Sequence, residues 1–147
     1  MRKFRFRLDS VVVYREYLKK KAQRQLFETR QKQQMLVEKK RGLEAEQADT
    51  RQRLQAMIGR GVAVPVFELH TRHLESLSEA IAGSDGLLKD QEREIKKQEQ
   101  HLKERLAAVK ILERLKDRQQ RAHDEKINRE EQKVMDETVV MRGGLTT

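Results

Sequence analysis

Residues 74–112, LESLSEAIAGSDGLLKDQEREIKKQEQHLKERLAAVKIL, decide the fold of this chain. The apolar residues that recur in this stretch at strict seven-residue spacing are Leu74, Ile81, Leu88, Ile95, Leu102 and Val109. Alternate positions of the same stripe are supplied by Leu77, Leu106 and Leu112. A seven-residue apolar repeat is typical of a coiled coil, in which a helix buries one narrow stripe against a partner helix. The stretch therefore predicts a long helix that packs on another helix.

A weaker form of the repeat precedes this stretch. It consists of Leu8, Ala22, Leu36, Leu43 and Met57, and it is interrupted by Arg15, Thr29 and Thr50. Most of the flanking positions are supplied by Val11, Leu18, Leu26 and Leu54, and the rest are mainly Gln and Lys. The first half of the chain is therefore predicted to be a second helix with a thin, partly polar stripe.

The two repeats are separated by Gly59-Arg60-Gly61-Val62-Ala63-Val64-Pro65. Glycines end a helix at little cost, and proline is tolerated in the first turn of the next helix. A connection this short folds the helices back on each other. We therefore predict an all-α fold, one two-stranded antiparallel coiled-coil hairpin over residues 1–147. Its helices span about 8–58 and 65–140, with the second continuous through Gly83 and Gly86 and a kink there left open.

The second helix is longer than the first. With the turn centred near residue 62, the section from about 123 to 147 has no partner within the hairpin. The strict repeat ends at Val109, and a separate apolar stripe follows at Ile127, Val134 and Met141. An apolar stripe on a lone helix is expected either to contact another protein or to be covered by the N-terminal segment.

Charge and composition limit the classes of function and partner that this chain can have. The chain has 147 residues, 39% of them charged, a net charge of +9, no Cys and no Trp. Residues 1–24 hold nine basic and two acidic side chains. A basic end suits nucleic acid, anionic lipid or an acidic protein surface, although it is also compatible with a merely solvated face. No known base-reading fold is visible, and Phe4 and Phe6 are too few for a base-stacking platform. No apolar run is long enough to span a bilayer, and we expect a cytosolic protein.

Catalytic motifs are not recognisable in the sequence. It contains no phosphate-binding Gly-Lys-Ser/Thr loop, no His-Glu-x-x-His motif and no Ser/His/Asp set. His70 and His73 are three residues apart and could share a metal, but solvated helix positions explain them more simply. We expect no enzyme activity, no metal and no cofactor.

The two ends of the chain carry a resemblance to a known family. Phe4-Arg5-Phe6-Arg7-Leu8 followed by Val11 and Tyr14-Arg15, and Gln132-Lys133-Val134-Met135-Asp136-Glu137 with Arg142, resemble the flagellar export protein family FliJ. The resemblance implies a soluble component of the flagellar type III export apparatus, which serves motility and chemotaxis. Its fold would look like the central stalk of rotary ATPases, and it would lie at the cytoplasmic face of the inner membrane.

The same resemblance implies partners and contact residues. The implied partners of a monomeric stalk are the hexameric export ATPase FliI, the export-gate protein FlhA and empty export chaperones. Together with the apolar stripe, it gives an ATPase-facing tip of Phe4, Phe6, Leu8, Ile127, Val134, Met135, Asp136, Glu137 and Met141. The implied gate-facing positions are Leu43, Leu77 and Ala80, although Leu43 and Leu77 also fall in the predicted helix interface.

Three alternatives remain open from the sequence. The first is the equivalent YscO-type stalk of a virulence injectisome, which would have the same fold. The second is a basic coiled-coil protein that binds nucleic acid or ribosomes, with an affinity that falls steeply as salt rises. The third is a homodimeric scaffold, in which a second copy would complete the thin apolar stripe.

Overall fold

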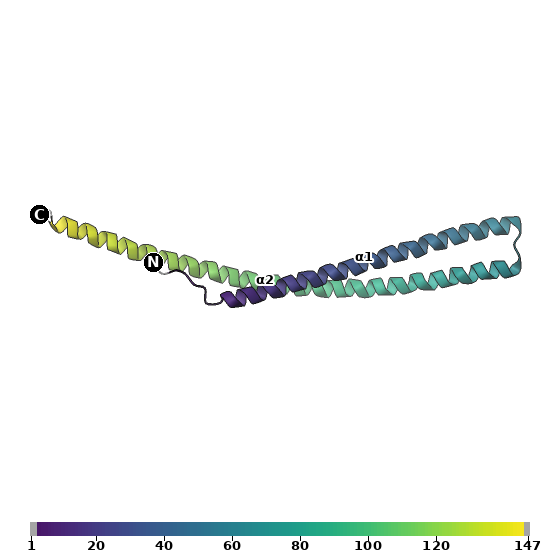
Figure 1. Ribbon diagram of the computed structural model, residues 1–147, viewed down its shortest axis with the longest axis horizontal. Coiled ribbons are helices and arrows are strands. Elements are labelled where there is room, and N and C mark those ends of the chain that lie inside the picture. Colours follow the sequence, from purple (N-terminus) through teal and green to yellow (C-terminus); the bar gives the residue numbers. More distant parts are fainter. Residues whose placement is uncertain (1–2, 146–147) are drawn as a thin grey trace. The chain divides into compact units, whose positions relative to one another are not determined.

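The computed structural model describes residues 3–145, and within them the chain forms two helices and no strand (Figure 1). Helix α1 spans Asp9–Arg60 with 52 residues, and helix α2 spans Val64–Leu145 with 82 residues. The helices pack against each other as a hairpin, so the predicted all-α hairpin is confirmed. Helix α2 runs uninterrupted through Gly83 and Gly86 and ends five residues later than the sequence suggested.

The connection between the helices contains only residues 61–63. Gly61 has a positive φ of 84°, a backbone conformation that favours glycine, and its N–H donates to the Ile58 carbonyl at 3.2 Å. The amides of Val66 and Phe67 both donate to the Ala63 carbonyl at 3.1 Å, which begins the second helix. Pro65 lies in this first turn, where its missing N–H costs nothing.

The chain divides into two compact units, described separately below. The turn unit is Lys21–Leu102, and the terminal unit combines Met1–Lys20 with Lys103–Thr147. Helices α1 and α2 each contribute to both units.

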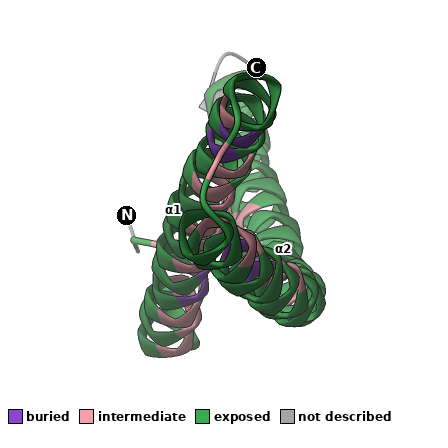
Figure 2. Cartoon of the chain, turned by 90° about the vertical axis from the view of Figure 1, so that its right-hand side faces the viewer, coloured by how far each residue is buried: buried purple, intermediate pink, exposed green. Residues whose placement is uncertain are grey.

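The core of the turn unit is a narrow interface between the two helices (Figure 2). One column on α2 is apolar, and its members Leu74, Ile81, Leu88, Ile95 and Leu102 are all buried or half-buried. The second column begins at the buried Leu77 but continues through Ser84, Gln91 and Gln98. In the middle of this interface, α2 therefore contributes one apolar column and one polar column.

Polar contacts join the two helices of the turn unit. Arg30 pairs with Glu99 at 2.9 Å, Lys40 pairs with Asp85, and the Gln47 amide donates to the Ser78 hydroxyl at 2.8 Å. The hydrogen bond to Asp85 raises the pKa of Lys40 above its usual value of 10.5. These contacts join specific residues of the two helices. They contribute little to the free energy of unfolding, because exposed ion pairs are each worth little.

The terminal unit packs the N-terminal segment and the start of α1 on α2. Its buried apolar residues are Phe6, Val109 and Leu112. The Arg15 guanidinium donates to the Ala108 carbonyl at 3.1 Å, and Lys116 pairs with Asp9 at 3.3 Å. Leu106, which the sequence pattern places in the interface stripe, is 36% exposed. The residue that lies at the helix interface here is the half-buried Arg105, three residues after Leu102. It is not Leu106, which comes four residues after Leu102.

Candidate partner-binding surface

The last section of α2 carries an uncovered apolar surface in the terminal unit. Every residue from 128 to 144 is exposed. The exposed large apolar side chains of this section are Val134, Met135, Val139, Val140 and Met141, each at least 62% exposed. We call residues 128–144 the C-terminal section. Monomeric soluble proteins rarely leave such a surface uncovered unless it serves a contact.

The start of this section is later than the sequence indicated. The ring of Phe4 lies 5.7 Å from the ring of His123, so the N-terminal segment accompanies α2 at least to that residue. Ile127, one turn further, is half-buried. The expected uncovered region therefore begins at about residue 128 and not at 123. The N-terminal segment therefore does not cover the stripe at Val134 and Met141, which remain exposed, and contact with another protein stays a prediction.

The remaining residues of the predicted ATPase-facing tip differ in their environment. Phe6 is only 5% exposed and belongs to the core of the terminal unit. Phe4 is half-buried against His123, and Leu8 is 37% exposed. Phe4 and Phe6, which belong to the motif that resembles the family, therefore anchor the N-terminal segment to α2. A partner would contact the residues around Phe6 more readily than the buried Phe6 side chain.

Two polar side chains of the C-terminal section form hydrogen bonds within their own helix. The Gln132 amide donates to the Asp136 carboxylate at 3.3 Å, and the Thr138 hydroxyl donates to the Val134 carbonyl at 2.8 Å. Asp136 and Glu137 are both exposed and lie between Met135 and Val139 in the sequence. The surface thus combines apolar and charged side chains, as protein–protein contacts commonly do.

The three predicted gate-facing residues do not form one exposed patch. Leu77 is 5% exposed because it occupies the helix interface of the turn unit. Leu43 is half-buried in the same interface, and only Ala80 is exposed. A partner that approaches this region of the hairpin would therefore meet Ala80 and its polar neighbours before either leucine.

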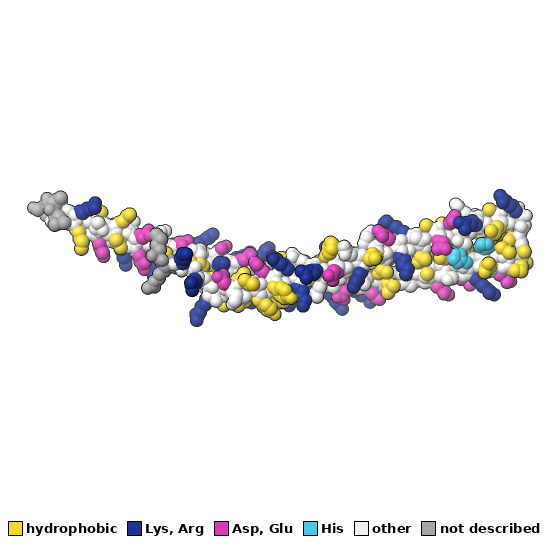
Figure 3. Space-filling model, in the orientation of Figure 1, with side chains coloured by type: hydrophobic (Ala, Val, Ile, Leu, Met, Phe, Trp, Pro, Cys, Tyr) yellow, Lys and Arg dark blue, Asp and Glu magenta, His cyan; other side chains and the backbone are white. Residues whose placement is uncertain are grey.

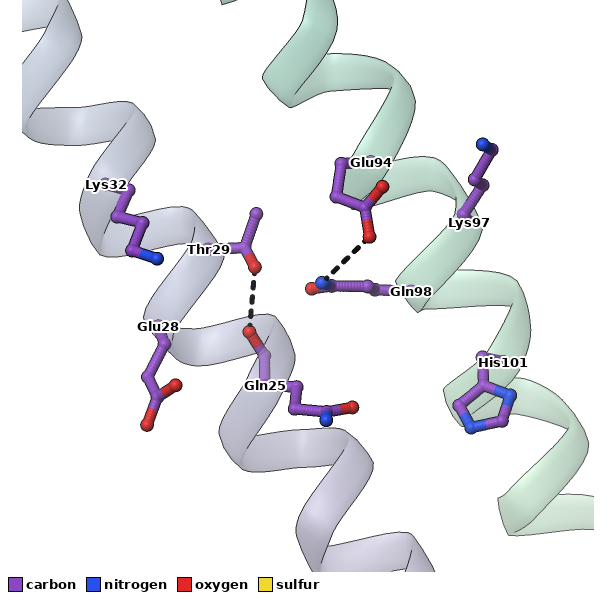
Figure 4. Close-up of a pocket in the computed structure, with 8 residues that line it drawn as sticks. All are labelled: Gln25, Glu28, Thr29, Lys32, Glu94, Lys97, Gln98 and His101. Atoms are coloured by element: carbon purple, nitrogen blue, oxygen red, sulfur yellow. Dashed lines mark hydrogen bonds between the residues drawn. The ribbon is translucent and has the colours of Figure 1, made fainter.

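A polar groove in the turn unit is the other candidate site, and Figure 4 shows its lining. Gln25, Thr29 and Lys32 line it from α1, and Gln98 and His101 line it from α2. The Thr29 hydroxyl donates to the Gln25 carbonyl at 2.9 Å, so this hydroxyl is engaged by its own helix. The groove assembles no nucleophile with a base, and we assign it no chemistry.

His70 and His73, the two histidines three residues apart, have different surroundings. His73 lies 3.3 Å from the Glu46 carboxylate, while His70 is half-buried. Within residues 3–145, no group of three or more His, Cys, Asp or Glu side chains is arranged to hold a metal ion. Across the same residues, neither helix is long and apolar enough to cross a membrane.

Comparison with known proteins decides the family. The family model described as the flagellar FliJ protein matches residues 4–144, nearly the whole chain. The chain belongs to the FliJ family. The FliJ family match places it among the components associated with flagellar protein export. No curated protein and no solved structure was similar to it in the corresponding searches.

Proposed function

We propose that this FliJ-family chain acts as a stalk for the flagellar export ATPase. In this proposal the C-terminal section of α2 enters the ring of the hexameric ATPase FliI, and the chain itself catalyses nothing. The observation that carries the proposal is the exposed apolar surface of Val134, Met135 and Met141 in a chain that matches the family throughout. Asp136 and Glu137 would supply charged contacts on the same surface.

The stalk would couple ATP turnover to export through differential affinity. A protein without catalytic activity shifts the states of a ring only if it binds some subunit conformations more tightly than others. A single helix cannot match all six subunits at once, so its binding favours an asymmetric ring.

We further propose contacts with the export gate FlhA through the turn unit near Ala80, and with export chaperones. These contacts would hold the chain at the cytoplasmic face of the inner membrane.

Direct binding to the cognate ATPase tests the ring contact. We expect the double variant Val134→Ser, Met141→Ser to bind the hexamer at least about tenfold more weakly than the natural chain, because two anchors of the contact lose their apolar burial. Both side chains are more than 60% exposed, so the fold should persist. The matched control is Val13→Ser, Met35→Ser, which alters two side chains of similar exposure on α1 and should keep full affinity.

The truncation that lacks residues 128–147 provides a second comparison. It retains the contact between Phe4 and His123 and should keep its helical content apart from the deleted turns. We expect it to bind the ATPase no better than the double variant. Equal affinity of the natural chain, the double variant and the truncation would contradict the assignment of the ring contact to the C-terminal section.

A further inference from the structure

A second uncovered apolar cluster surrounds the connection between the helices. Five large apolar side chains within residues 58–69 are exposed, and they gather at the right-hand end of the view in Figure 3. They are Ile58, Val64, Val66, Phe67 and Leu69, with exposed fractions from 39% to 68%. We call this cluster the apolar turn. It lies within the turn unit and shares no residue with the C-terminal section.

The side chains of the apolar turn do not form one stripe. At 100° per residue, Val64, Leu69, Val66 and Phe67 point about 0°, 140°, 200° and 300° around the start of α2. Ile58 adds a further apolar side chain from the end of α1. A helix that lies in a protein groove presents one face, whereas this cluster encircles the turn. Its geometry suits a surface that the turn enters end-on.

The charge around the apolar turn is strongly one-sided. Residues 51–73 contain four arginines and one glutamate, and no acidic residue lies between Asp49 and Glu68. Arg53 pairs with Asp49 at 2.7 Å. Within the described part of the chain, Arg51, Arg60 and Arg72 belong to no ion pair. An apolar surface with unpaired arginines within it and on both flanks in the sequence matches an anionic lipid interface, in which phosphates lie above the acyl chains.

We propose that the apolar turn inserts into an anionic lipid surface. Val64, Phe67 and Leu69 enter the boundary between headgroups and acyl chains, and Arg60 and Arg72 extend their charged ends to the phosphates. The insertion is shallow because the last carbonyls of α1 need water or donors, which the headgroup layer supplies and the hydrocarbon core does not.

Self-association of the apolar turn is disfavoured by the same charges. Two copies that met turn to turn would bring together two net positive segments, each with four arginines and the single acidic residue Glu68. A lipid surface of opposite charge removes this repulsion. The proposal does not depend on the proposed ATPase contact, because the residues of the two surfaces are different.

The sequence offers a direct probe of insertion because it contains no tryptophan. In the variant Phe67→Trp of the full chain, the single indole should shift its emission to shorter wavelength when phosphatidylcholine vesicles with about 30% phosphatidylglycerol are added. Lipids brominated near the headgroup should quench it more than lipids brominated at the acyl end. The control Met35→Trp, on the exposed face of α1, should show neither effect. No shift for Phe67→Trp, or equal shifts for both variants, would overturn the proposal.

Vesicle sedimentation of otherwise natural chains gives an independent readout. We expect Val64→Ser, Leu69→Ser to lower the partition coefficient at least about tenfold, and Arg60→Gln, Arg72→Gln to lower it by a similar factor on anionic vesicles only. The control Val13→Ser, Met35→Ser should sediment like the natural chain. Equal partition of all variants would contradict the proposal. A natural chain that does not sediment with vesicles in the absence of other proteins would also contradict it. In that case a protein partner, and not lipid, would be what covers the apolar turn.

Discussion

At the scale of single residues, glycine has opposite roles at two positions. Gly61 adopts a positive φ of 84°, and Gly86 lies inside helix α2. A Cβ atom added at Gly86 meets open space, so alanine there changes only the helix propensity. The turn depends on the first glycine, whereas the second weakens the helix that contains it.

We expect Gly86→Ala to raise the free energy of unfolding by about 0.5–1 kcal/mol, because alanine loses less backbone entropy in a helix. We expect Gly61→Ala to lower it by about 1–2 kcal/mol, because an alanine in the left-handed region is strained. Chemical denaturation followed by circular dichroism measures both. A change of the same sign in the two variants would contradict the roles assigned here.

Residue patterns predicted some side-chain positions and missed others. The burial of Ile95 and Val109 follows from their seven-residue spacing, because that spacing keeps a helix position against its partner. Phe6 belongs to no repeat, and its burial depends on the path of a non-helical segment along α2. No local pattern in the sequence contains that information, so its role as an anchor could only be found in the structure.

At the scale of the helices, the interface of the turn unit has an unusual polar column. Gln91 and Gln98 lie seven residues apart on α2, and the side-chain oxygen of each is buried without a hydrogen-bond partner in the described structure. A buried acceptor that lacks a donor costs about 1–3 kcal/mol. The sequence predicted a thin apolar stripe, but only the structure showed that these two glutamines occupy it.

Replacing this polar column should strengthen the hairpin. We expect Gln91→Leu, Gln98→Leu to raise the free energy of unfolding by about 1–3 kcal/mol, because each change removes an unpaired acceptor and adds apolar burial. Gln100→Leu, at an exposed position of the same helix, is the matched control and should stay within about 0.5 kcal/mol of the natural chain. A thermal melt in which the double variant unfolds earlier would show that the glutamines have partners.

At the scale of the whole molecule, the two apolar surfaces arise from different causes. The C-terminal section is uncovered because α2 has 82 residues and α1 only 52. The unequal helix lengths and the separate stripe of Val134 and Met141 were predictable from the sequence. The point where coverage ends was not, because it depends on the contact of Phe4 with His123. The apolar turn escaped prediction because its residues follow no helical period.

The central claim is that the C-terminal section of this FliJ-family chain acts on the export ATPase. The most direct measurement is the rate of ATP hydrolysis by the cognate ATPase with the natural chain, with Val134→Ser, Met141→Ser, and with Val13→Ser, Met35→Ser. We predict that the natural chain and the α1 control stimulate hydrolysis, while the C-terminal variant leaves it at the basal rate. Stimulation by the C-terminal variant equal to that by the natural chain would contradict the account.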